Sequence, residues 1–154
     1  DNALHGYLSF GVLEHFEHGL DPALIEANRV LAPGGMLVLT IPYPNLVWRL
    51  VQLKRRVKGK SRLTNDDFYE STYTQHELID AVQRTGFQPV LVRPTSHSFT
   101  LWGLGGPFQG EGYYRTSTLA DVLGRLVQRL MPWTFNFSTM VIARKVHHVA
   151  GGTH

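Results

Sequence analysis

The sequence predicts an α/β fold built on a mostly parallel β-sheet. Two observations predict it: apolar, strand-like runs alternate with amphipathic helical patterns, and polar side chains follow a predicted strand end. The run at residues 36–41 is continuously apolar, which is typical of a strand covered on both faces. Because open α/β sheets bind ligands beside the carboxyl ends of their strands, we expect the functional site there.

The first predicted unit is a strand, a helix and a second strand. Leu, Tyr and Phe predict a buried strand at Leu4–Phe10. An Asp-Pro pair at residues 21–22 predicts a helix start, because aspartate caps free backbone amides and proline suits the first helical position. A Pro-Gly-Gly turn at residues 33–35 ends this helix and leads into the strand at 36–41.

A second helix is predicted at residues 45–58, inside a helical insertion that spans 45–72. Thr74 and Glu77 then have the spacing of a capping box, in which each side chain accepts a hydrogen bond from the backbone amide of the other residue. Gly86 is placed to end the helix that follows, in the left-handed conformation typical of glycine there.

The last third of the chain predicts a strand at 89–93, a loop, a helix and a final strand. Five glycines between residues 103 and 112 predict a long loop over 95–116. Leu and Val recur at helical spacing over 119–130, and the apolar pattern of 135–144 predicts the last strand.

Length and composition predict one domain over residues 1–146 and a disordered tail at 147–154. A chain of 154 residues with 43% hydrophobic and 18% charged residues can bury a sizeable core. It has no cysteine, which excludes disulfides and thiolate metal sites and favours a reducing, cytoplasmic location. No stretch has the pattern of a signal peptide or a membrane span.

Residues 10–44 carry three phrases in order: Phe-Gly-Val-Leu-Glu-His-Phe, Arg-Val-Leu-Ala-Pro-Gly-Gly and Ile-Pro-Tyr-Pro. They resemble the second half of class I S-adenosylmethionine-dependent methyltransferases of the type 11-like group. The resemblance implies the C-terminal part of a Rossmann-like, doubly wound sheet, with an antiparallel last strand inserted between its two predecessors. It also implies S-adenosyl-L-methionine as the cofactor of the complete domain and a small-molecule methyl acceptor.

Two features of that family are absent from this sequence: a glycine-rich turn after a first strand, and an acid at the end of a second strand. The glycines at 103–110 do not substitute, because Pro107 interrupts them and the next predicted helix begins well downstream. We therefore expect a truncated domain that alone binds the cofactor poorly and is inactive. Without a first strand, Leu4–Phe10 becomes a bare sheet edge, which predicts a homo-oligomer.

By resemblance, Ser9, Phe10 and Gly11 line the cofactor pocket, although core packing explains Phe10 equally well. Glu14 and His15 follow the predicted strand end and are the candidate catalytic residues. His15 is suited to act as a general base or to orient the nucleophile, because imidazole titrates near neutral pH. Alternatively, both side chains cap the next segment and face solvent.

Tyr43, Tyr69, Tyr73 and His76 are the predicted substrate-side residues, again by resemblance; core packing is the alternative for Tyr73. The run Glu-His-Phe-Glu-His lacks the spacing that projects two imidazoles from one helical face, so we predict no metal site.

Residues 49–62 hold seven basic residues and no acid. An amphipathic, basic segment at 45–62 is consistent with an anionic lipid surface, or with a lid helix whose charges are solvated. One short basic stretch with a single aromatic residue argues against nucleic acid.

Two further hypotheses for the function of the chain remain: a non-catalytic half-domain that serves as an assembly or lipid-surface module, and another doubly wound enzyme such as a dehydrogenase.

Overall fold

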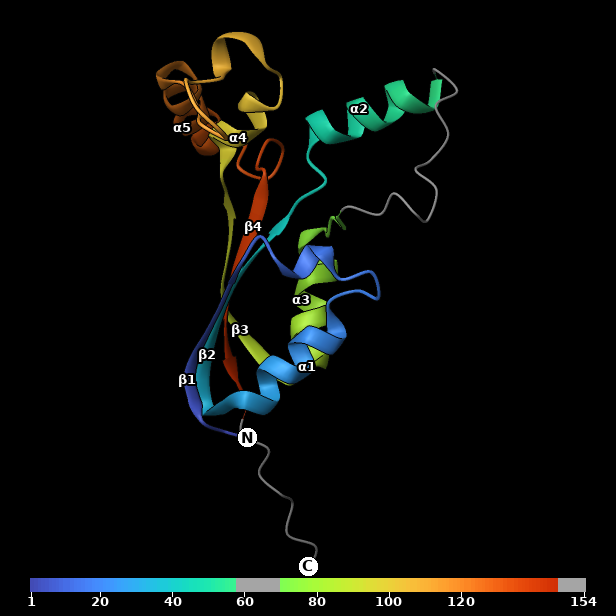
Figure 1. Cartoon of the computed structure of the whole chain (residues 1–154), viewed down its shortest axis with the longest axis vertical. Helices are drawn as coiled ribbons and strands as arrows, with labels where there is room; N and C mark the ends of the chain where they lie inside the picture. Colours follow the sequence, from blue (N-terminus) through green and yellow to red (C-terminus); the bar gives the residue numbers. More distant parts are fainter. Residues whose placement is uncertain (58–69, 147–154) are drawn as a thin grey trace, which may run out of the picture.

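The computed structural model describes residues 1–57 and 70–146. The strands, in chain order, are β1 (Leu4–Phe10), β2 (Leu31–Pro42), β3 (Phe87–Thr95) and β4 (Ser138–Lys145). The helices are α1 (Asp21–Val30), α2 (Leu46–Val57), α3 (Gln75–Arg84), α4 (His97–Trp102) and α5 (Thr118–Leu130), with short 3-10 turns η1 (Leu13–His15) and η3 (Gly106–Phe108) (Figure 1).

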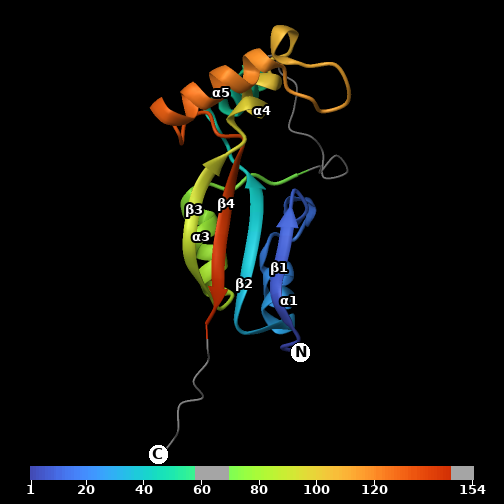
Figure 2. The same cartoon turned by 90° about the vertical axis from the view of Figure 1, so that its left-hand side faces the viewer.

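The four strands form one sheet in the order β1-β2-β4-β3 (Figure 2). β1 and β2 are parallel, whereas β4 runs antiparallel to both of its neighbours, β2 and β3. The last strand in sequence is therefore inserted between the two strands that precede it, which confirms the predicted topology. β1 lies at one edge of the sheet.

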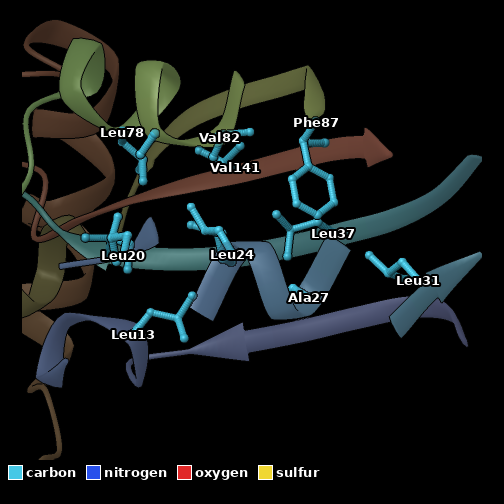
Figure 3. Close-up of a cluster of buried hydrophobic side chains, with 14 residues drawn as sticks. Leu13, Leu20, Leu24, Ala27, Leu31, Leu37, Leu78, Val82, Phe87 and Val141 are labelled. Carbon is cyan, nitrogen blue, oxygen red and sulfur yellow. The ribbon is translucent and has the colours of Figure 1, made fainter. Parts of the chain in front are cut away.

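α1 and α3 pack on one face of the sheet and enclose the hydrophobic core (Figure 3). Leu24 and Ala27 of α1 meet Leu78 and Val82 of α3 above the strands, and Phe87 closes one end. Burial of these side chains supplies the main stabilisation of the fold, at about 1.5–3 kcal/mol for each large one.

The start and end of α3 agree with the sequence prediction. The Thr74 hydroxyl accepts from the Glu77 amide, and the Glu77 carboxylate accepts from the Thr74 amide at 2.8 Å, which confirms the capping box. Gly86 adopts a positive φ of 88°, as predicted for a helix-ending glycine. The predicted aspartate cap of α1 is wrong, because the Asp21 carboxylate accepts two hydrogen bonds from Arg84 instead.

The sequence predicted a strand covered on both faces, and this prediction is wrong for the opposite face of the sheet. Among the described residues no helix covers it, and Figure 2 views this face with α1 and α3 behind the strands. Leu8 and Phe10 of β1 are exposed, and Met36 and Val38 of β2 are half-buried. β1 is thus an exposed edge strand and not a buried one.

The region predicted as one long loop contains structure. α4 and η3 lie within it, so the prediction is wrong for residues 97–102, and α4 packs against α5. The strand boundaries also move: β2 begins at Leu31 and β4 at Ser138. The predicted tail at 147–154 lies outside the described residues. No described helix is long and apolar enough to cross a membrane.

Candidate functional site

Two adjoining cavities lie where β1 and β2 have their carboxyl ends, at the end of the sheet that carries α2 and α4 (Figure 1). The first, here the strand-end cavity, has a volume of about 220 Å³. It is lined by Phe10, Gly11, Glu14, Thr40, Pro42, Ser96, Phe99, Phe137 and Ser138. The second, the aromatic cavity, has a volume of about 160 Å³ and shares Pro42, Phe99 and Phe137 with the first.

The end of β1 sets the lining of the strand-end cavity. Side chains alternate along the strand, so Ser9 is buried on the side of the core and Phe10 is exposed on the opposite face. Gly11 then turns the chain with a φ of 65°, a conformation that strongly favours glycine. The turn leads into η1, in which Leu13 and Glu14 are buried.

Among the described residues, Glu14 is the one acid that lines the strand-end cavity, and it is only 4% exposed. Its Oε2 atom has no hydrogen-bond partner among the described residues. Burial raises the pKa of the Glu14 carboxyl, and nearby Glu70 acts in the same direction, whereas the Glu14 backbone amide and His15 lower it. A buried oxygen without a partner costs about 1–3 kcal/mol, which a ligand that donates a hydrogen bond would recover.

Hydroxyl groups form another side of the strand-end cavity. Ser96 has a φ of 61°, which is uncommon for a residue other than glycine and is typical of sites under functional constraint. The Ser138 hydroxyl lies 3.0 Å from that of Thr95. These groups are potential ligand partners at the start of β4 and the end of β3.

The aromatic cavity is mainly apolar. Tyr43 and Trp48 line it together with the shared Phe99 and Phe137, whose ring centroids lie 5.8 Å apart. The polar members of its lining are Asn45, Glu70, Thr72 and Thr100. A pocket of this kind fits a small, largely apolar molecule that carries a few polar groups.

Asn45 holds the aromatic cavity together. Its side-chain oxygen accepts from the Trp48 amide at 2.9 Å and caps the first turn of α2. Its amide nitrogen donates to the Thr100 hydroxyl at 3.3 Å and to the Asn136 carbonyl at 3.1 Å. One buried side chain thus connects α2, α4 and the segment that precedes β4.

The predicted cofactor-side and catalytic residues do not all lie in the same place. Phe10, Gly11 and Glu14 line the strand-end cavity, whereas Ser9 lies on the side of the core. His15 is exposed and is not part of the lining of either cavity.

The predicted substrate-side residues also separate. Tyr43 lines the aromatic cavity. Tyr73 packs against the core, and its amide donates to the Pro42 carbonyl at 3.1 Å. His76 is exposed on α3 and lies 3.0 Å from the Asp80 carboxylate. Tyr69 lies outside the described residues.

The sequence prediction missed the residues that α4 and the neighbouring turns contribute. Ser96, Phe99 and Thr100 fall in the stretch predicted as a loop, because its glycines obscured a helix of only six residues. Asn45 carried a recognisable signal, since asparagine directly before a helical pattern is a preferred cap. Among the described residues, no three His, Asp or Glu side chains are grouped to hold a metal ion.

No protein-family model matches the chain, and no curated protein matches it by sequence. Solved structures do match. One is from the complex between the Haloferax volcanii Trm112 methyltransferase activator and a methyltransferase, with a TM-score of 0.55, 13% identity, and 96% of this chain and 56% of that chain covered.

Two S-adenosylmethionine-dependent methyltransferases match equally well, from Methanosarcina mazei and Archaeoglobus fulgidus. Each has a TM-score of 0.55 and 15% identity, and the match covers 61% of its length. It covers 95% of this chain in the first case and 94% in the second. The chain therefore has the class I methyltransferase fold and spans between 56% and 61% of the length of these three structures.

The fold alone does not determine the reaction. The [4+2]-cyclase SpnF also matches, with a TM-score of 0.51 and 16% identity. The reaction is therefore inferred from the residues of the two cavities.

Proposed function

We propose that the chain forms the acceptor-side part of an enzyme that transfers a methyl group from S-adenosyl-L-methionine to a small molecule. The observation that carries this proposal is the pair of adjoining cavities at the carboxyl ends of β1 and β2. A methyl transfer needs two ligands held end to end, and two cavities that share Pro42, Phe99 and Phe137 suit that requirement.

The strand-end cavity is the proposed donor side. When bound there, S-adenosyl-L-methionine supplies a methyl group already activated by its positively charged sulfur. Phe10 offers an apolar face to a flat ring, Gly11 allows close approach of the backbone, and the unpartnered oxygen of Glu14 accepts a hydrogen bond. A carboxylate at this position also favours a neighbouring positive charge.

The aromatic cavity is the proposed acceptor side. Tyr43 and Trp48 hold the apolar body of the acceptor, and Asn45 keeps α2 in position through its three hydrogen bonds. Orientation of the acceptor supplies the main catalytic effect, because the donor needs little acid–base help. In this proposal Glu14, which lines the strand-end cavity, and not the exposed His15, is the group that receives or holds a proton.

We further propose that the edge of β1 pairs with a second copy of the chain. Two observations support this: β1 is an edge strand, and its apolar Leu8 and Phe10 are exposed. Light scattering should then detect an oligomer that Leu8→Lys converts to monomers, whereas a monomeric unmodified chain at micromolar concentration would contradict self-pairing.

A titration followed by amide NMR tests the donor site, because it detects weak binding. S-Adenosyl-L-methionine should shift the amide signals of Phe10, Gly11 and Glu14 and leave those of α1 unchanged. Phe10→Ala should weaken binding about tenfold, the scale of one lost aromatic contact. Phe16→Ala is the matched control, because Phe16 is similarly exposed but lines neither cavity. Absence of shifts at the three positions, or equal effects of both variants, would refute the proposed donor site.

A further inference from the structure

α5 carries a stripe of exposed apolar side chains. Leu119, Val122, Leu126 and Leu130 follow one another at spacings of three or four residues, so they share one side of the helix. Each is between 46% and 68% exposed. Neither cavity uses any of them.

Packing fixes the direction in which this stripe faces. Ala120 and Gly124, on another side of α5, are buried. α4 approaches Gly124 so closely that a Cβ atom there would lie 2.6 Å from the Ser98 hydroxyl oxygen. The small residues therefore turn one side of α5 toward α4, and the apolar stripe is left to face outward.

α2 repeats the pattern at the same end of the molecule (Figure 1). Leu46, Leu50 and Leu53 share one side of the helix and are between 41% and 58% exposed. α2 lines the aromatic cavity through other residues, Val47 and Trp48. Two separate helices at this end of the molecule thus present apolar stripes.

The charges beside the α5 stripe are positive. Arg125 and Arg129 are exposed and follow Val122 and Leu126 by three residues, which places them along one flank of the α5 stripe. The one acid of α5, Asp121, is half-buried and accepts a hydrogen bond from the Thr116 hydroxyl at 2.8 Å.

α2 contains four basic residues and no acid within its twelve residues. Helices with an apolar side and basic flanks bind in the plane of an anionic lipid surface, where long cationic side chains reach the headgroups.

We propose that α2 and α5 together seat this chain on the surface of an anionic lipid bilayer. The occupant follows from charge complementarity: the positive flank of α5 meets negative headgroups while the apolar stripes enter the boundary with the acyl chains. Helices of 12 and 13 residues suit this position, because they are too short to span the hydrocarbon layer. The inference goes beyond the proposed methyl transfer and does not depend on it.

Co-sedimentation of the 154-residue chain with vesicles tests the proposal. The chain should sediment with phosphatidylcholine vesicles that contain phosphatidylserine, should sediment weakly with phosphatidylcholine alone, and should be released by added salt. Joint replacement Arg125→Gln and Arg129→Gln should lower the partition coefficient about 30-fold, since each basic residue near such a surface contributes about a factor of five. Arg144→Gln, an exposed arginine on β4, is the matched control.

The apolar contribution is tested separately. Leu126→Ser should weaken binding about tenfold, and Ile25→Ser on α1, where the side chain is at least as exposed, should leave binding unchanged. Lipids brominated in their acyl chains should quench Trp48 emission, measured as the part of the signal that Trp48→Phe removes. Failure of the unmodified chain to sediment with anionic vesicles would overturn the proposal. So would a Leu126→Ser variant that keeps vesicle binding but loses self-association, because the stripe would then bind a second copy.

Discussion

The two ends of the sheet are held together by different interactions. Between the sheet and the pair α1 and α3, apolar packing dominates, and the residues of this core are at most 2% exposed. At the carboxyl ends of β1 and β2, cavities open and buried polar side chains make the connections. The buried side-chain atoms found without partners in the described part of the chain are Glu14 Oε2, His97 Nδ1, Asn136 Oδ1 and Thr139 Oγ1.

The difference indicates a division of labour along the strands. An apolar core tolerates no open space, because each lost contact and each void costs stability. A binding site needs polar groups that are not fully satisfied, and the core must compensate for their cost. Glu14, which lines the strand-end cavity, is such a group, and the unpartnered hydroxyl of Thr139 lies at the same end of the sheet. Substitutions at the two ends of the sheet should therefore change the free energy of unfolding by different amounts, and not always in the same direction.

The largest expected effect is in the core. Leu24→Ala should lower the free energy of unfolding by about 2–5 kcal/mol, because Leu24 is fully buried and its removal leaves a cavity. The neighbouring Ile25 is 59% exposed on the same helix, so Ile25→Ala should change stability by no more than about 0.5 kcal/mol. Urea unfolding followed by circular dichroism measures both values. Equal losses for the two variants would mean that α1 is not packed against the sheet as described.

The sequence predicted the core end better than the cavity end, for physical reasons. Strand and helix periodicities depend on local burial, so β1, α1, α3 and the capping box at Thr74 were predictable. The cavities depend on contacts between distant residues, such as Asn45 with Asn136, which no local pattern encodes. Glu14 and His15 were predicted together because they are adjacent in the sequence. The 3-10 turn η1 buries the side chain of Glu14 and leaves that of His15 exposed.

Asn45 tests whether polar contacts stabilise the cavity end. Asn45→Ala removes its three hydrogen bonds and should lower the free energy of unfolding by about 1–3 kcal/mol. Asn45→Ser is the matched variant: serine keeps the cap on the Trp48 amide but is too short to reach Thr100 and Asn136. The difference between the two variants, from parallel urea unfolding curves, isolates the cap of α2 at about 1 kcal/mol. If both variants match the unmodified chain, Asn45 does not hold the helices together.

The smallest expected effect is that of replacing Glu14. This replacement should raise the free energy of unfolding, whereas the replacements of Leu24 and Asn45 lower it. Because burial raises the pKa of Glu14 in the folded chain, the unfolded chain loses its proton first as pH rises above the ordinary value of 4.5. Stability therefore falls through the interval up to the raised pKa, and the loss remains at neutral pH.

Glu14→Gln cannot ionise, so it should be more stable than the unmodified chain at neutral pH, and equally stable below pH 4.5. Glu77→Gln is the control, because the pKa of Glu77 is shifted in the opposite direction. The hydrogen bonds from Thr74 lower the pKa of Glu77, so this variant should lose a little stability at neutral pH and none in acid. Unfolding curves for the three proteins across this pH range compare the two carboxyls directly. A Glu14→Gln variant with unchanged or reduced stability at neutral pH would show that the Glu14 carboxyl is solvated. The cavity end would then not carry the cost of this buried, unpartnered polar group.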